Sequence, residues 1–109
     1  MKKLLILCLF FPAVTFADRQ TGYITGYVPT FDGEQEVFIF KLEDNVIDGC
    51  NTTGRYAIGS ASATYNTIKT SVVAAFHGKA KVTVEYDGSC DVWSNSFDAT
   101  RACFGTINC

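Results

Sequence analysis

The sequence predicts a mainly β domain that contains a single helix. Five short segments combine β-branched and aromatic residues and end near turn signals such as Asp32-Gly33, which is typical of strands. Between the third and the fourth of them, apolar residues recur every three or four positions, which is typical of an amphipathic helix. Four of the five cysteines follow residue 17, an even number that indicates two disulfides in an exported domain.

Residues 1–17 have the pattern of a secretory signal peptide. Lys2 and Lys3 precede an apolar run, 4–11, and small residues stand before a cleavage point after residue 17. A membrane anchor is the alternative, but the run is far shorter than the ~20 residues that span a bilayer. We therefore expect a single domain over 18–109, secreted or periplasmic and bacterial in type. Without the two lysines, its formal charge changes from −2 to −4.

The first two predicted strands differ in how they distribute their apolar residues. In 21–30, Ile24 and Val28 share one face at period two, which leaves the other face to Tyr23, Thr25 and Tyr27. The second strand, 36–42, is apolar on both faces in its central part. This predicts a strand that is covered on both sides, as in a small barrel. The remaining predicted strands are 52–58, 81–86 and 101–107.

The predicted helix covers 62–77, and its apolar residues form one stripe. Ser60 or Ser62 is suited to cap its start, and Gly78 is suited to a left-handed turn at its end. The order β-β-β-α-β-β is that of an OB-fold-like five-stranded Greek-key barrel, in which the helix would close one end. An α+β sheet covered by one helix has the same order, so both architectures remain open.

Composition and motifs argue against several classes of function. Nine basic against eleven acidic residues give no electrostatic footprint for a nucleic acid. Neither a phosphate-binding loop, a GxSxG motif nor an HExxH motif occurs. His77, the only histidine, falls at the predicted helix end, where a solvated side chain is expected. The sequence therefore predicts a protein that is not an enzyme and needs neither metal nor cofactor.

The cysteines of the predicted domain are Cys50, Cys90, Cys103 and Cys109. A zinc site is the alternative to disulfides, but the chain has no CxxC pair. Four cysteines allow three pairings, and spacing does not choose among them. Our preference is Cys50–Cys90 with Cys103–Cys109.

Several residues could recognise a sugar, which typically stacks on an aromatic ring and hydrogen-bonds short polar side chains. The candidate rings are Tyr23, Tyr27, Phe31 and Trp93, and Trp93 stands among short polar residues in 91–96. The alternative is that Trp93 packs beside the Cys90 bridge and that the tyrosines cover the barrel. Asn51-Thr52-Thr53 is also a glycosylation sequon, which would be idle in a bacterial host.

Thr21-Gly22-Tyr23-Ile24, the end of the predicted helix and the segment Lys81-Val82-Thr83-Val84-Glu85-Tyr86 resemble the B subunits of AB5 toxins. Within these toxins, the most similar group is that of subtilase cytotoxin and the pertussis-like toxins. Gly-Cys-Asn-Thr-Thr and Cys-x-x-Trp-x-Asn-Ser resemble small exported bacterial proteins whose role is unknown.

The toxin resemblance implies an OB-fold, a homopentamer and non-catalytic binding of cell-surface glycans. The family's sugar-contacting serine, which precedes a glycine in the first strand, falls on Thr21. The resemblance leaves open whether an A-type toxin chain exists. We thus predict tentative glycan contacts at Thr21, Tyr23, Tyr27 and Trp93. A second hypothesis is a monomeric secreted or periplasmic interaction protein, such as an inhibitor that inserts a loop into a hydrolase.

Overall fold

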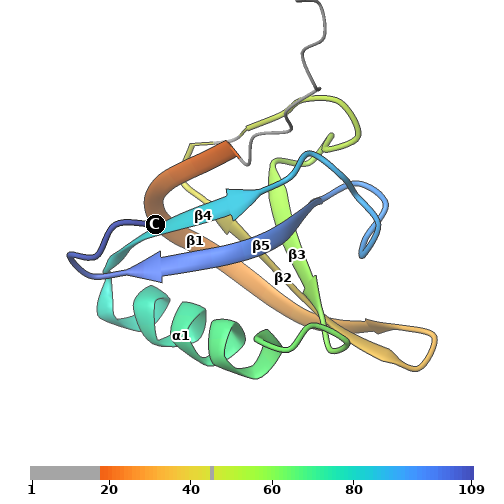
Figure 1. Ribbon diagram of the computed structural model, residues 1–109, viewed down its shortest axis with the longest axis horizontal. Coiled ribbons are helices and arrows are strands. Elements are labelled where there is room, and N and C mark those ends of the chain that lie inside the picture. Colours follow the sequence, from red (N-terminus) through yellow and green to blue (C-terminus); the bar gives the residue numbers. More distant parts are fainter. Residues whose placement is uncertain (1–17, 45) are drawn as a thin grey trace, which may run out of the picture.

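A computed structural model describes residues 18–44 and 46–109 (Figure 1). The predicted signal peptide, residues 1–17, lies outside this described part. The elements follow the predicted order β-β-β-α-β-β. They are β1 (Asp18–Asp32), β2 (Gln35–Leu42), β3 (Arg55–Gly59), α1 (Tyr65–Gly78), β4 (Lys81–Tyr86) and β5 (Phe97–Phe104).

The five strands form one mixed sheet whose pairing closes on itself in the order β1-β2-β3-β5-β4. The long strand β1 makes this closure possible, because Asp18–Tyr23 pair with β4 and the part from Ile24 onward pairs with β2. Every pairing is antiparallel except that of β3 with β5, which is parallel and short. Figure 1 shows the two halves of the sheet crossing, with α1 lying along one end. The prediction of a mainly β domain with one helix is therefore confirmed.

A bulge in β1 overturns the predicted faces of this strand. The register with β2 shifts between Ile24 and Gly26, and an inserted residue reverses which following side chains point inward. Ile24 is buried as expected, but Val28 is exposed and Tyr27 packs against the core instead. The prediction that Ile24 and Val28 share one face, and that Tyr23 and Tyr27 share the other, was wrong for this reason.

Strand β2 is buried on both faces, as its composition predicted. Phe38 and Phe40 point into the main core, where Phe40 lies 5.8 Å from Tyr56 between ring centroids. Val37 and Ile39 point to the other side and form a second, small cluster with Ala57. Each face of β2 is thus covered, but by different parts of the chain.

Helix α1 buries the predicted stripe, which consists of Tyr65, Ile68, Val72 and Ala75. These four residues belong to the main core, so the helix is held by the apolar inner surface of the sheet. Both predicted end signals were displaced. The N-cap is Thr64 rather than Ser60 or Ser62, and its side chain makes no capping hydrogen bond. Gly78 is the last helical residue, and Lys79 takes the left-handed conformation with φ 56°.

Both disulfides have the predicted pairing. Cys50–Cys90 joins the loop after β2 to the loop after β4, and Cys103–Cys109 ties the C-terminal residues back to β5. The bounds of two strands differ from the prediction. β3 begins at Arg55 rather than at residue 52, and β5 spans Phe97–Phe104 rather than 101–107. Among the residues that the structure describes, no helix is long and apolar enough to cross a membrane.

Candidate functional site

The four predicted glycan contacts do not gather in one place. Thr21 and Tyr23 lie together on the outer face of β1, both exposed. The bulge turns Tyr27 toward the core, and Trp93 lies in the loop between β4 and β5, against another part of the sheet. The four residues therefore do not form one site, and each location has to be considered separately.

Trp93 covers the outer face of β2 and β3. Together with Val92 it packs on the small cluster of Val37, Ile39 and Ala57. The loop is held in this position by the carboxylate of Asp98, which accepts hydrogen bonds from the backbone N–H of Val92 at 2.9 Å and of Asp91 at 3.1 Å. The half-buried indole therefore packs on this small apolar cluster.

A polar network fixes the far end of the same loop. The Arg55 guanidinium donates to Asn95 Oδ1 at 3.0 Å, and the Thr53 hydroxyl donates to the Asn95 carbonyl at 2.7 Å. Asn51 is fully buried, and its Oδ1 accepts from the Gly54 backbone N–H at 3.0 Å. Its Nδ2 donates to the Val46 carbonyl at 3.0 Å. The Asn51 sequon is therefore inaccessible to a glycan in the folded chain, and its residues have a structural role.

Tyr27 is half-buried between the sheet and the last turn of α1. Its ring lies 5.5 Å from the rings of both Phe38 and Phe76, measured between centroids. Its hydroxyl lies 3.3 Å from His77 Nε2. Tyr27 thus joins β1 to the end of α1.

The outer face of β1 and β4 carries a polar arrangement of the kind expected at a sugar site. Three residue pairs lie directly opposite each other across the two strands, and each pair is in side-chain contact. The hydroxyls of Thr21 and Thr83 are 2.8 Å apart, and the Lys81 ammonium is 5.6 Å from the centre of the Tyr23 ring. The third pair is Arg19 with Glu85, whose side chains form a 2.9 Å ion pair.

A hollow of about 520 Å³ opens beside Tyr23, between β1 and the end of α1. Ile24, Ala75 and Phe76 give it an apolar lining, whereas His77 and Lys79 are polar and exposed. The Tyr23 ring, which is 42% exposed, lines the same hollow. One aromatic ring therefore lies next to hydroxyls along the strand and next to an apolar hollow toward the helix.

The backbone of Tyr23 is fixed by Glu43, the residue after β2. The Tyr23 N–H donates to Glu43 Oε1 at 3.2 Å, and the Glu43 N–H donates to the Tyr23 carbonyl at 2.9 Å. The neighbouring Gly22 leaves room for that carboxylate, because a Cβ there would lie 3.3 Å from Glu43 Oε1. Tyr23 is thus held at the point where β1 leaves β4 and joins β2.

Such a face can bind and orient a ligand. It offers an aromatic surface with a cation over it, two hydroxyls that donate and accept, and further cations at its ends. The clear pKa shifts occur elsewhere: burial raises the pKa of Tyr56 and of Tyr86, and a hydrogen bond from Lys69 lowers the pKa of the exposed Glu36. Within 18–44 and 46–109, no group of three His, Cys, Asp or Glu residues is arranged to hold a metal ion.

No protein-family model matches this chain, and no curated protein or solved structure shows significant similarity to it. The resemblance to AB5 toxin B subunits therefore remains a prediction that none of these comparisons tests.

Sequence reasoning did not include Lys81 and Thr83 among the candidate contacts. The alternation in Lys81–Tyr86 placed both on the outer side of their strand. The sequence pattern did not show which strand lies beside this one. Only the β1–β4 register brings Thr83 to Thr21 and Lys81 to Tyr23.

Proposed function

We propose that this protein is a non-catalytic, glycan-binding module and that the outer face of β1 and β4 is its binding site. The observation that carries the proposal is the contact set around Tyr23. An exposed aromatic ring has a lysine ammonium 5.6 Å from its centre and adjoins a pair of threonine hydroxyls 2.8 Å apart. Sugars are recognised by this combination, because their C–H faces stack on aromatic rings and their hydroxyls need polar partners of both kinds.

The proposed fold is an OB-fold-like barrel. Support comes from the closed strand order β1-β2-β3-β5-β4 and from the helix between β3 and β4. OB-folds commonly bind ligands on strands 2 and 3, between the loop after the first strand and the loop after the fourth. In this chain Trp93 and Val92 cover that surface. We therefore place glycan binding on β1 and β4 rather than on β2 and β3.

A glycan array followed by retention on beads that carry the best glycan tests this function. Tyr23→Ala removes the ring, and Thr21→Ala removes one hydroxyl of the pair. We expect each to weaken binding by about tenfold, equivalent to about 1.4 kcal/mol. Thr67→Ala, an exposed threonine of α1, is the matched control and should bind like the unaltered protein. An empty array, or equal retention of all variants, would contradict the proposal.

The toxin resemblance adds a ring of five subunits, and the mass of the protein in solution tests this part separately. A pentamer would support an assembly like that of the toxin B subunits. A monomer that still binds a glycan would leave the binding function intact but remove the assembly.

The hairpin between β1 and β2 favours the second candidate function, that of an inhibitor or interaction protein. Phe31 is 71% exposed on this hairpin, next to the turn at Asp32 and Gly33. An exposed phenylalanine at the end of a paired hairpin is suited to insertion into a partner's cleft. Phe31→Ala should leave glycan retention unchanged but abolish hydrolase inhibition if this candidate is correct.

A further inference from the structure

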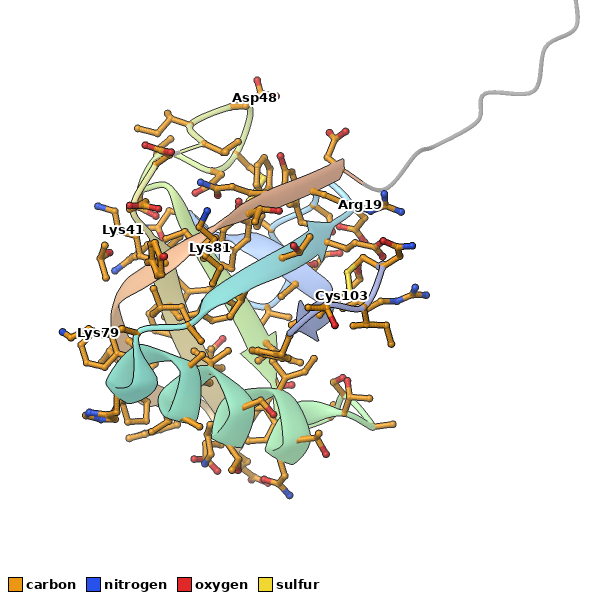
Figure 2. All side chains as sticks on the ribbon, turned by 90° about the vertical axis from the view of Figure 1, so that its left-hand side faces the viewer. Arg19, Lys41, Asp48, Lys79, Lys81 and Cys103 are labelled. Atoms are coloured by element: carbon orange, nitrogen blue, oxygen red, sulfur yellow. A yellow bond between two sulfur atoms is a disulfide. The ribbon has the colours of Figure 1, made fainter. Side chains whose placement is uncertain are left out.

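The basic side chains of the domain are concentrated on one face, although the chain as a whole is acidic. Apart from Lys2 and Lys3, the sequence contains seven Lys and Arg residues. Five of them point outward from β1, β2, β4, β5 and the end of α1. They are Arg19, Lys41, Lys79, Lys81 and Arg101, and we call them the basic face. Figure 2 shows Lys41, Lys79 and Lys81 on the side that faces the viewer.

Two acidic residues near this face, Glu43 and Glu85, are already engaged. Glu43 hydrogen-bonds the backbone of Tyr23. Glu85, whose side chain is 8% exposed, lies between two arginines, 2.9 Å from Arg19 Nε and 3.6 Å from Arg101 Nε. The charge of this one carboxylate balances that of only one of the two guanidinium groups, and Arg19 Nη2 also donates to the Cys109 carbonyl at 3.3 Å. Both arginine side chains are more than half exposed.

Many other acidic residues lie away from the basic face. Asp48 is exposed in the loop after β2, and Figure 2 shows it at the top of the molecule, apart from Lys79 and Lys81. Asp32 and Glu34 flank the turn between β1 and β2, and Asp87 and Asp91 are exposed in the loop after β4. The charge is therefore segregated, and such segregation steers oppositely charged ligands toward one face despite the net charge.

Four of the five cations, all except Lys41, form two groups with the proposed sugar contacts between them. Arg19 and Arg101 lie at one end of the β1–β4 face, and Lys81 and Lys79 lie at the other. Along β1, the positions of Arg19 and Tyr23 are four residues apart, which is about 13 Å of strand. The Thr21–Thr83 hydroxyl pair is midway. A ligand that meets both groups must be longer than one sugar ring and must carry anionic groups at more than one position.

We propose that the basic face binds a linear polysaccharide with repeated anionic groups, such as sulfates or carboxylates. This inference rests on the proposed glycan-binding function and specifies its ligand class. The anionic groups would meet the lysines and arginines at the two ends, where guanidinium and ammonium groups donate charge-assisted hydrogen bonds. The hydroxyls of the sugar between them would meet the threonine pair and the Tyr23 ring.

The composition of the face favours a polysaccharide over other polyanions. Proteins that bind single-stranded nucleic acids stack successive bases on several aromatic rings, whereas Tyr23 is the ring presented between these cations. Proteins that bind lipid surfaces combine a basic cluster with apolar anchors, whereas the centre of this face consists of threonine hydroxyls.

The test measures retention of the purified protein on immobilised polysaccharides at low salt. The probes are heparin, which carries sulfates and carboxylates, hyaluronan, which carries carboxylates alone, and neutral dextran. We expect retention on heparin or hyaluronan, elution by added salt because exposed charges are screened, and no retention on dextran. Retention on heparin but not on hyaluronan would assign the ligand's anionic groups to sulfate.

Two variants of equal charge change provide the decisive comparison. Lys81→Gln removes a cation of the basic face, and Lys69→Gln removes one from α1, where Lys69 pairs with Glu36 at 3.0 Å. We expect Lys81→Gln to weaken polyanion binding about fivefold and Lys69→Gln to leave it unchanged. A second variant, Lys79→Gln, lies outside the sheet and should act like Lys81→Gln even if the latter disturbs β4. Equal loss in the basic-face variants and the control would overturn the proposal.

The outcomes separate this inference from the function on which it rests. If neutral glycans are retained in a Tyr23-dependent manner but heparin and hyaluronan are not, the polyanion inference fails and glycan binding stands. If single-stranded DNA or phosphatidylglycerol vesicles bind as tightly as heparin, the face is a general anion surface, and the assignment to polysaccharides fails.

Discussion

Two outer faces of the same closed sheet differ in how they are covered. On β2 and β3, apolar residues face outward and the β4–β5 loop closes over them with Val92 and Trp93. On β1 and β4, the outward residues are polar, charged or, at Tyr23, aromatic. Glu85 is buried between its two arginines, but Arg19, Thr21, Lys81 and the 42% accessible Tyr23 are exposed. A strand buried on both faces therefore requires a loop to cover it, whereas a strand that alternates inner apolar and outer polar residues leaves one face available.

The comparison also shows that an aromatic residue in a polar segment can have either of two roles. Trp93 is surrounded in sequence by short polar residues, but their hydrogen bonds hold the loop to the sheet. Tyr23 is surrounded in space by polar residues from another strand, which contact its ring and face solvent. The two roles differ in what the surrounding polar groups contact. Those beside Trp93 hydrogen-bond to backbone and to neighbouring segments, whereas those beside Tyr23 face solvent.

Removing the Cys50–Cys90 bridge should have the largest effect on stability. The damage should fall on the outer face of β2 and β3 that the Trp93 loop covers, which we call the covered face. The bridge encloses 40 residues and anchors the loop that carries Trp93. Replacing both cysteines with alanine should lower the free energy of unfolding by about 4 kcal/mol, whereas the same change at Cys103 and Cys109, only six residues apart, should cost about 2 kcal/mol. Urea unfolding of both double variants checks this order, and the reverse order would contradict it.

Trp93→Ala should destabilise the protein without affecting ligand binding. Because the half-buried indole packs on Val37, Ile39 and Ala57, its loss should cost about 2 kcal/mol. Urea unfolding measures the cost, and bead retention at low temperature measures binding. Since Trp93 is the only tryptophan, its fluorescence in the unaltered protein should also stay constant when glycan is added. A glycan that quenches this fluorescence would place the site on the covered face.

Tyr23→Ala should show the opposite behaviour. Its ring lies on the exposed outer face of β1 and β4, which we call the open face. It contacts Lys81 through a cation–π interaction, which contributes less than about 1 kcal/mol at an exposed site. We expect a tenfold loss of glycan affinity, measured by retention, and a change of less than about 0.5 kcal/mol in unfolding. Tyr23→Phe keeps the ring and is the matched control. Large destabilisation by Tyr23→Ala would mean that this residue is structural, as Trp93 is.

The interior tyrosines should make stability fall at alkaline pH. Burial raises the pKa of Tyr56 and Tyr86 above the usual tyrosine value of about 10, and the nearby Asp18 and Asp48 further raise that of Tyr86. Their contribution is complete below pH ~10 and is lost as the pH rises further, because the unfolded chain ionises first.

Urea midpoints at pH 8, 10 and 11 measure this loss. Tyr86→Phe should make the decline shallower, and Tyr23→Phe on the open face should leave it as steep. Equal slopes for the unaltered protein and Tyr86→Phe would show that the interior tyrosines do not control the decline.

Much of the fold could be predicted because its signals are local. The helical stripe from Tyr65 to Ala75 and the doubly apolar β2 each follow from periodicity within one segment. The disulfide pairing was correct as a preference, although spacing alone did not exclude the two other pairings.

The candidate site could be predicted only in part, because it depends on contacts between distant segments. Thr21 and Tyr23 were identified from their own strand, but Thr83 and Lys81 join them through a register that spans some sixty residues. Tyr27 was misplaced because a bulge leaves little signal in residue types. The packing of Trp93 could not be predicted from its polar sequence neighbours, because its apolar partners lie on β2 and β3.

A nuclear magnetic resonance titration with the best-binding glycan tests the central claim most directly, because it reports on both faces of the sheet in one experiment. The claim predicts that the shifted amide signals cluster at Thr21, Tyr23, Lys81 and Thr83, while those of Val92 to Asn95 stay in place. Shifts confined to Val92 to Asn95 and the neighbouring β2 and β3 would contradict it, because they would place the ligand on the face that Trp93 covers.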